Sequence, residues 1–301
     1  MTRFEHRRAW LRIAATLPLT VAIGARAAQT PAPDSPGSPD SPEARLAQLE
    51  QSAGGRLGVF ALNTADGTQI GHRADERFPF CSTFKVILIG AILARSAQAA
   101  GLMQQRIHYT AGEVVHYSAV TAEHVSDGMT VAELCAAAIQ RSDNTAANLL
   151  IRLLGGPDAV TAYARSLGNP VFRLDRLETA LNDAVPGDPR DTASPAAMAR
   201  SLQALTLGEA LPLAQRTQLL DWLRGNRMGA QRIRAALPAG WTSGDKTGTG
   251  DYGTANDLGL IWPPSRAPIL LGIYHTQAQQ DAKARDDVIA AAARIVVGAM
   301  S

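Results

Sequence analysis

Segments typical of β-strands gather near the two ends of this 301-residue chain, and helical segments fill its middle. Near the N-terminus, residues 56–63 are strand-like, and a turn at residues 65–67 leads into a short second strand, which indicates a hairpin. Residues 258–262 and 269–274 form another strand pair across two prolines, and residues 282–297 have the pattern of a helix. This arrangement predicts one sheet assembled from both ends of the chain, with helices inserted between them.

The predicted fold class is therefore α+β, with an antiparallel sheet flanked by helices and an inserted all-helical lobe. We expect residues 44–76 and 224–301 to form the α/β lobe, and residues 77–223 to form the helical lobe. Runs such as residues 131–139 and 145–154 have helical periodicity. The junction of two such lobes is a common place for a small-molecule pocket.

The first 27 residues have the pattern of a secretory signal peptide. Arg7, Arg8 and Arg12 form a basic start, residues 13–23 are an apolar run, and residues 25–27 read Ala-Arg-Ala, which suits a cleavage site. The apolar run is too short to span a bilayer, and a buried N-terminal helix would leave the basic-apolar-small order unexplained. The sequence thus predicts an exported, periplasmic protein, and its Arg7-Arg8 pair resembles a twin-arginine signal.

Residues 28–43 are rich in Pro and Ser and lack apolar periodicity, so we expect them to be a solvated tether. Residues 1–27 hold five of the 29 basic residues and one of the 27 acidic residues, which leaves 24 and 26 and a net charge of −2. The basic character of the whole chain therefore belongs to the export signal. Without a basic stripe, nucleic acid is not an expected partner.

A serine and a lysine three residues apart, Ser82 and Lys85, open an apolar helical segment. A serine hydroxyl needs a base to act as a nucleophile, and a lysine one turn further along the helix lies on the same face. The N-terminal end of a helix also favours developing negative charge. Taken alone, the pair fits equally well a helix cap with a solvated lysine.

Ser142-Asp143-Asn144 lies between two predicted helices. Each of these residue types suits a helix N-cap. In a functional interpretation, Ser142 relays a proton to a departing amide nitrogen and Asn144 binds a substrate amide, while Asp143 is structural.

Lys246-Thr247-Gly248 lies in a predicted strand over residues 241–249. The lysine suits a substrate carboxylate, the threonine offers a hydroxyl, and the glycine permits close approach of a ligand. An exposed strand end would account for the same residues.

A long segment without helical periodicity, residues 173–191, carries Glu178 and Asn182. A loop of this length in a compact domain is usually functional or disordered, and its charges also fit a plain surface loop. A carboxylate and an amide four residues apart can hold one water molecule for hydrolysis. We expect an ion pair between Arg176 and Asp191 to close the base of this loop.

Together, these four elements resemble the class A serine β-lactamases in order and spacing over about residues 44–300. The resemblance implies hydrolysis of the β-lactam amide bond of penicillins and cephalosporins through a serine acyl-enzyme, and hence antibiotic resistance. It also implies a monomer without cofactor or metal, free of stable membrane association after processing. The histidines show no spacing typical of metal ligands.

The resemblance assigns roles to individual residues. The catalytic residues would be Ser82 as the acylated nucleophile, Lys85 and Glu178 as bases, and Ser142 as the proton relay. Glu178 would also activate the deacylating water. The implied substrate-binding residues are Asn144, Asn182, Lys246, Thr247, Gly248, Thr249, Tyr117 and Arg232.

Two structural expectations also follow from the resemblance. The first is a cis peptide bond after Glu178. The second concerns the cysteines: some members bridge the position of Cys81 to that of Gly250, and others bridge the position of Cys135 to that of Ile89. This chain has one half of each pair, so we expect two free, buried thiols.

Two alternatives remain. A penicillin-binding protein, acting as a peptidoglycan carboxypeptidase or transpeptidase, shares the acylation motifs but lacks a carboxylate equivalent to Glu178. An exported binding domain would keep the cleft without turnover.

Overall fold

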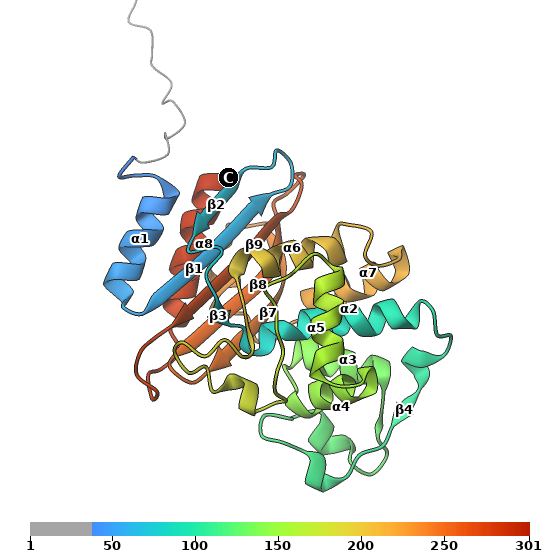
Figure 1. Ribbon diagram of the computed structural model, residues 1–301. Helices are drawn as coiled ribbons and strands as arrows, with labels where there is room; N and C mark the ends of the chain where they lie inside the picture. The colour runs from blue at the N-terminus through green and yellow to red at the C-terminus, as the bar shows by residue number, and fades with distance from the viewer. Residues whose placement is uncertain (1–37) are drawn as a thin grey trace, which may run out of the picture. The chain divides into compact units, whose positions relative to one another are not determined.

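The computed structural model describes residues 38–301, so the predicted signal peptide and most of the tether lie outside the described residues. A five-stranded antiparallel sheet with strand order β2-β1-β9-β8-β7 forms its centre (Figure 1). The strands are β1 (Arg56–Asn63), β2 (Gln69–His72), β7 (Thr242–Gly250), β8 (Thr254–Trp262) and β9 (Ile269–Thr276). Strand β1 pairs with β9 along its whole length, from Arg56 opposite Thr276 to Asn63 opposite Ile269. Both ends of the chain therefore build one sheet, as predicted.

Successive side chains of β1 point to opposite faces of the sheet, and each face has its own core. Leu57 and Val59 pack with residues of α1 (Pro42–Ala53) and α8 (Asp286–Met300). Phe60 instead belongs to the larger core that the sheet shares with the inserted helices. Helices thus cover both faces (Figure 1), and the α+β prediction is confirmed.

The inserted helices surround one largely apolar helix that follows the predicted nucleophile. They are α2 (Lys85–Ser96), α3 (Val131–Gln140), α4 (Asn144–Leu154), α5 (Pro157–Ser166), α6 (Pro195–Thr206) and α7 (Leu213–Arg224). Helix α2 is buried from Lys85 to Leu93 and contacts α3, α4, α5, α6 and α7. Two small ladders complete the fold, β3 (Phe78–Pro79) with β6 (Thr192–Ala193), and β4 (Arg106–Ile107) with β5 (Met129–Thr130).

The last helix begins at Asp286 and ends at Met300, whereas the sequence pattern placed it over residues 282–297. The segment before it is joined to the turn between β7 and β8, because the Gln277 N–H donates to the Tyr252 carbonyl and the Tyr252 N–H donates to the Gln280 carbonyl. Strand β8 also begins earlier than expected, at Thr254.

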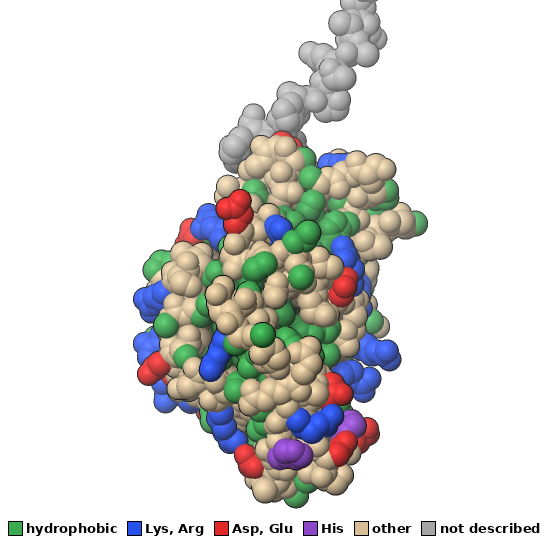
Figure 2. Space-filling view, turned by 90° about the vertical axis from the view of Figure 1, so that its right-hand side faces the viewer, with side chains coloured by type: hydrophobic (Ala, Val, Ile, Leu, Met, Phe, Trp, Pro, Cys, Tyr) green, Lys and Arg blue, Asp and Glu red, His purple; other side chains and the backbone are tan. Residues whose placement is uncertain are grey.

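Figure 2 shows charged side chains of both signs around one face, with hydrophobic side chains across its middle. This view has no continuous basic surface, which agrees with the charge of the chain without its first 27 residues. Within residues 38–301, no helix is both long enough and apolar enough to cross a membrane.

Candidate active site

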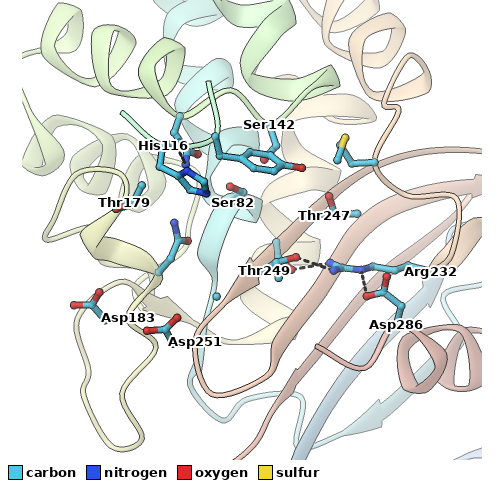
Figure 3. Close-up of a pocket in the computed structure, with 16 residues that line it drawn as sticks. Ser82, His116, Ser142, Thr179, Asp183, Arg232, Thr247, Thr249, Asp251 and Asp286 are labelled. Atoms are coloured by element: carbon cyan, nitrogen blue, oxygen red, sulfur yellow. Dashed lines mark hydrogen bonds and ion pairs between the residues drawn. The ribbon is translucent and has the colours of Figure 1, made fainter. Parts of the chain in front are cut away.

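A cleft of about 630 Å³ opens between strand β7, the segment before helix α4, and the 173–191 loop (Figure 3). Its lining residues are Ser82, His116, Tyr117, Ser142, Asn144, Thr179, Asn182, Asp183, Met228, Arg232, Thr247, Gly248, Thr249, Gly250, Asp251 and Asp286. Nine predicted site residues are in this set. The other three, Lys85, Glu178 and Lys246, are buried directly behind the lining. All twelve therefore meet at one place.

Ser82 lies in a 3₁₀ turn, Cys81–Phe84, that continues directly into helix α2. Its hydroxyl faces the cleft at the N-terminal end of this helical segment, where backbone N–H groups have no partner within the helix. The preceding Cys81 has φ of 45°, a left-handed conformation that is strained for a residue with a side chain. The fold thus holds the residue just before the predicted nucleophile in a costly backbone conformation.

Glu178 and Lys85 form a fully buried ion pair next to Ser82. Glu178 Oε1 lies 2.9 Å from Lys85 Nζ, and it accepts a hydrogen bond from Ser82 Oγ at 3.3 Å. Lys85 Nζ also donates to the Ser142 carbonyl at 2.9 Å and to Asn144 Oδ1 at 2.8 Å. The carboxylate is therefore positioned to take the serine proton, and the ammonium has three acceptors.

The second lysine of the site, Lys246, donates from Nζ to Ser142 Oγ at 3.1 Å and to the Thr247 carbonyl at 2.8 Å. Burial lowers the pKa of Lys246 well below its usual range, and the positive charge of Lys85 adds to this effect. Burial also lowers the pKa of Lys85, against the opposing attraction of Glu178. Lys85 thus contacts the backbone carbonyl of Ser142, and Lys246 contacts its hydroxyl.

The Ser142-Asp143-Asn144 motif both caps a helix and lines the cleft, the two roles that the sequence suggested. Asp143 is the N-cap of helix α4, because its Oδ1 accepts from the Ala146 N–H at 2.9 Å. Ser142 has φ of 56° and points into the cleft. Asn144 also lines the cleft, but its amide already bridges protein groups, since Nδ2 donates to the His116 carbonyl at 3.0 Å.

The 173–191 loop is fixed at its base and at Glu178, the predicted catalytic carboxylate. Arg176 Nε lies 2.6 Å from Asp191 Oδ2, which confirms the predicted ion pair. Asn148, on helix α4, donates from Nδ2 to the Glu178 carbonyl at 2.8 Å and accepts from the Glu178 N–H at 2.9 Å. Asn182 Nδ2 donates to Glu178 Oε2 at 2.5 Å. The peptide bond after Glu178 is cis, as expected.

Strand β7 approaches the nucleophile closely because it carries glycine at position 248. A Cβ atom there would lie 2.7 Å from the Phe80 carbonyl oxygen and 3.2 Å from the Ser82 nitrogen. Any larger residue would push the strand away from the turn of Ser82. This spacing brings the backbone of Thr249 beside the nucleophile.

Arg232 reaches the same strand from the segment after helix α7. Its Nη2 donates to Thr249 Oγ1 at 2.7 Å, and its Nη1 donates to the carbonyls of Gly248 and Asn256 at 2.7 and 2.6 Å. Asp286 holds the other edge of the guanidinium at 2.9 Å (Figure 3). Arg232 therefore brings positive charge to one end of the cleft in a fixed orientation.

Several residues of the site were missed from sequence. Asn148 gave no signal, because a lone asparagine within an amphipathic helix looks like an ordinary surface or core residue. Its contact with Glu178 spans 30 residues and depends on the tertiary fold. Asp183 and Asp251 each follow a predicted motif, and only the structure shows that both line the cleft.

Both cysteines are free and buried, as predicted. Burial raises the pKa of each thiol, so neither is activated as a nucleophile. Over residues 38–301, no group of three or more His, Cys, Asp or Glu side chains is arranged to hold a metal ion.

Comparison with known proteins identifies relatives over nearly all of this chain. A family model described as the β-lactamase enzyme family matches residues 41–300. β-Lactamase OXY-2 of Klebsiella oxytoca is 52% identical over 96% of this chain and 98% of its own. β-Lactamase Toho-1 of Escherichia coli is 52% identical over 96% of this chain and 97% of its own. A crystal structure of a β-lactamase from Desulfarculus baarsii has a TM-score of 0.85 and 57% identity, and covers 86% of this chain and 97% of that one.

Proposed function

The chain belongs to the class A β-lactamases, and on that premise we propose how its residues divide the reaction. It hydrolyses the amide bond of β-lactam antibiotics and so confers resistance. We propose penicillins and cephalosporins as its substrates. The observation that carries the mechanism is the contact of Glu178 Oε1 with both Ser82 Oγ and Lys85 Nζ.

In acylation, Ser82 Oγ attacks the β-lactam carbonyl carbon and its proton passes to Glu178. The sequence left open whether Lys85 or Glu178 is the dominant base. Lys85 Nζ has three acceptors in contact, so its protons are all engaged and it stabilises the negative charge of Glu178 instead. The backbone N–H groups of Ser82 and Thr249 bind the oxyanion that forms on the carbonyl oxygen.

The carbon–nitrogen bond of the ring then breaks, and the departing nitrogen takes its proton from Ser142. The hydroxyl of Ser142 recovers a proton from Lys246, whose Nζ lies 3.1 Å from Ser142 Oγ. Lys246 regains a proton from solvent, and Glu178 releases to solvent the proton that it took from Ser82, so both groups return to their starting charge before deacylation.

In deacylation, a water molecule takes the place that Ser82 Oγ has in acylation and becomes the attacking nucleophile. Asn182 positions the water beside Glu178, which removes a proton from it as the water oxygen attacks the ester carbonyl. The ester bond to Ser82 Oγ then breaks, and Glu178 returns the proton to that oxygen, which lies 3.3 Å from Glu178 Oε1.

The charged part of the cleft orients the substrate. The ring carboxylate binds at Lys246, Thr247 and Thr249, and Arg232 adds positive charge there. Tyr117 packs on the substrate, and Asn144 binds the amide of its acyl side chain. Gly248 gives the ring room against strand β7.

A penicillin-binding protein would share the acylation half of this mechanism. It is not favoured, because the relatives that match nearly all of this chain carry the name β-lactamase. The contact between Glu178 and Ser82 also supports a deacylating enzyme. A binding domain without turnover would have no use for the buried Lys85–Glu178 pair.

We also propose that the protein is exported to the periplasm through its N-terminal signal, of the twin-arginine type, and acts there as a monomer. The cleft lies between two lobes, residues 44–76 with 224–301 and residues 77–223. The serine pathway uses no metal or other cofactor.

Turnover of a chromogenic cephalosporin by the mature protein tests this function. We expect many turnovers per enzyme for the wild type and none for Ser82→Ala. Equal hydrolysis by both proteins would refute the assignment of Ser82.

A further inference from the structure

Asn256, near the start of strand β8, is fully buried and does not line the cleft. It lies directly opposite Gly248 of strand β7. The backbone carbonyls of both residues accept from Arg232 Nη1, at 2.6 Å for Asn256 and 2.7 Å for Gly248. The backbone of Asn256 therefore contacts the arginine at one end of the cleft, while its side chain makes a separate set of contacts.

The side-chain amide of Asn256 bridges two successive carbonyls just before Ser82. Its Nδ2 donates to the Pro79 carbonyl at 2.8 Å and to the Phe80 carbonyl at 3.1 Å. The two carbonyls point the same way because Phe80 has a helical backbone conformation, with φ of −81° and ψ of −22°. A primary amide suits this place, since it has two N–H donors. Asn256 Oδ1 has no hydrogen-bond partner within residues 38–301, so these two bonds are the only polar contacts of the side chain there.

The bridged carbonyls belong to the segment that sets the position of Ser82. Cys81, between Phe80 and Ser82, has φ of 45°, and such a conformation persists only where the surrounding structure imposes it. The Phe80 N–H donates to the Asp191 carbonyl at 3.1 Å. Phe80 is thus bound to the base of the long loop on one side and to strand β8, through Asn256, on the other.

We propose that Asn256 is a positioning residue for acylation by Ser82. Its amide binds the two carbonyls and so fixes the turn that orients Ser82 Oγ and the Ser82 N–H toward the substrate carbonyl. This inference rests on the proposed function, in which Ser82 is the nucleophile and its N–H binds the oxyanion. Without the amide, the backbone relaxes at Cys81, and a displacement of about 1 Å can lower a rate about 100-fold.

The same geometry predicts that substrate binding does not depend on the side chain of Asn256. Arg232 contacts the backbone carbonyl at this position, which every variant retains. The guanidinium is also held by Thr249 Oγ1 and by Asp286. A substitution of Asn256 should therefore lower the acylation rate constant and leave the dissociation constant of the substrate unchanged.

Two variants separate hydrogen-bond donation from packing. Asn256→Ala removes both donors and leaves a gap, whereas Asn256→Leu removes both donors but fills a similar volume. Stopped-flow measurement of a single turnover, with enzyme in excess over a chromogenic cephalosporin, follows the opening of the ring. Its dependence on enzyme concentration gives the acylation rate constant and the dissociation constant. The limiting rate constant belongs to folded enzyme alone, so a loss of stability does not imitate the effect.

We expect both variants to be acylated about 10- to 100-fold more slowly than the wild type, with dissociation constants within about twofold of its value. Asn63→Ala is the control, because Asn63 is also buried but binds within the β1–β2 turn. It should lower Tm and leave the rate constant unchanged. A normal acylation rate constant in either variant of Asn256 overturns the proposal, since the side chain would then act through packing or stability alone. Failure of the wild type to open the ring would instead refute the proposed function itself.

Discussion

Replacing Asn148 with alanine is expected to impair the enzyme through the loop that carries Glu178. Asn148 is 4% exposed, and both ends of its amide bind the backbone of Glu178, at 2.8 and 2.9 Å. Alanine would leave a buried N–H and a buried carbonyl without partners. Each unsatisfied group costs about 1–3 kcal/mol, so the folded state should lose about 2–6 kcal/mol if the loop keeps its position.

The same loss has a catalytic consequence. If the loop relaxes to recover its hydrogen bonds from water, Glu178 moves relative to Ser82, and a displacement of about 1 Å can reduce a rate about 100-fold. Deacylation should suffer more than acylation, because it depends on Glu178 and Asn182 together. We expect an acyl-enzyme to accumulate in Asn148→Ala with a cephalosporin substrate.

The assay combines thermal unfolding with burst kinetics on a chromogenic cephalosporin. If Asn148→Ala destabilises the protein by the upper part of the range given above, its Tm should fall by on the order of 10 °C for a protein of this size. Asn63→Ala is the control, because Asn63 is also buried and accepts from the Ala65 N–H in the β1–β2 turn. It should lower stability without producing a burst. Unchanged Tm and unchanged turnover in Asn148→Ala would refute this account of the loop.

Three further predictions concern the rest of the molecule. Arg232→Ala should lower kcat/KM about 10- to 100-fold, mainly through KM, because a charge-assisted contact to the ring carboxylate is lost; steady-state kinetics with an unchanged KM would contradict it. The thiols of Cys81 and Cys135 should stay unreactive toward Ellman's reagent in the native protein and react in denaturant, since burial raises both pKa values. Burial lowers the pKa of His275 in the folded state, so the free energy of unfolding should fall as pH drops below about 6.5. His275→Gln, which keeps a donor for the Gly54 carbonyl, should reduce this loss of stability at low pH, as measured by urea unfolding. An identical pH dependence in the variant would show that His275 is not its cause.

Much of the fold was predictable because its signals are local. Short apolar runs bounded by turn residues marked strands β1, β8 and β9, and the apolar run after Ser82 marked helix α2. The predicted position of the last helix was wrong by a few residues, because the segment before it is hydrogen-bonded to Tyr252 in the turn between β7 and β8. Periodicity carries no information about such contacts.

The site was predictable to the extent that its residues stand in short motifs. Ser82, Ser142 and Lys246 each have a partner nearby in sequence, and their order identified the family. Asn148 and Asp251 have no such neighbours, since Asn148 bonds to Glu178 across 30 residues and Asp251 bonds to Asn182 in the distant loop. Resemblance alone also left the base of acylation open, whereas the contacts of Lys85 favour Glu178.

The most direct test of the mechanism is intact-mass spectrometry of the mature protein during reaction with a cephalosporin, beside Glu178→Gln. We expect the wild type to return to its free mass while product accumulates. The variant should persist as an adduct that maps to Ser82, because its acyl-enzyme cannot activate water. A stable adduct on both proteins, formed once and not hydrolysed, would contradict deacylation through Glu178 and indicate a penicillin-binding protein.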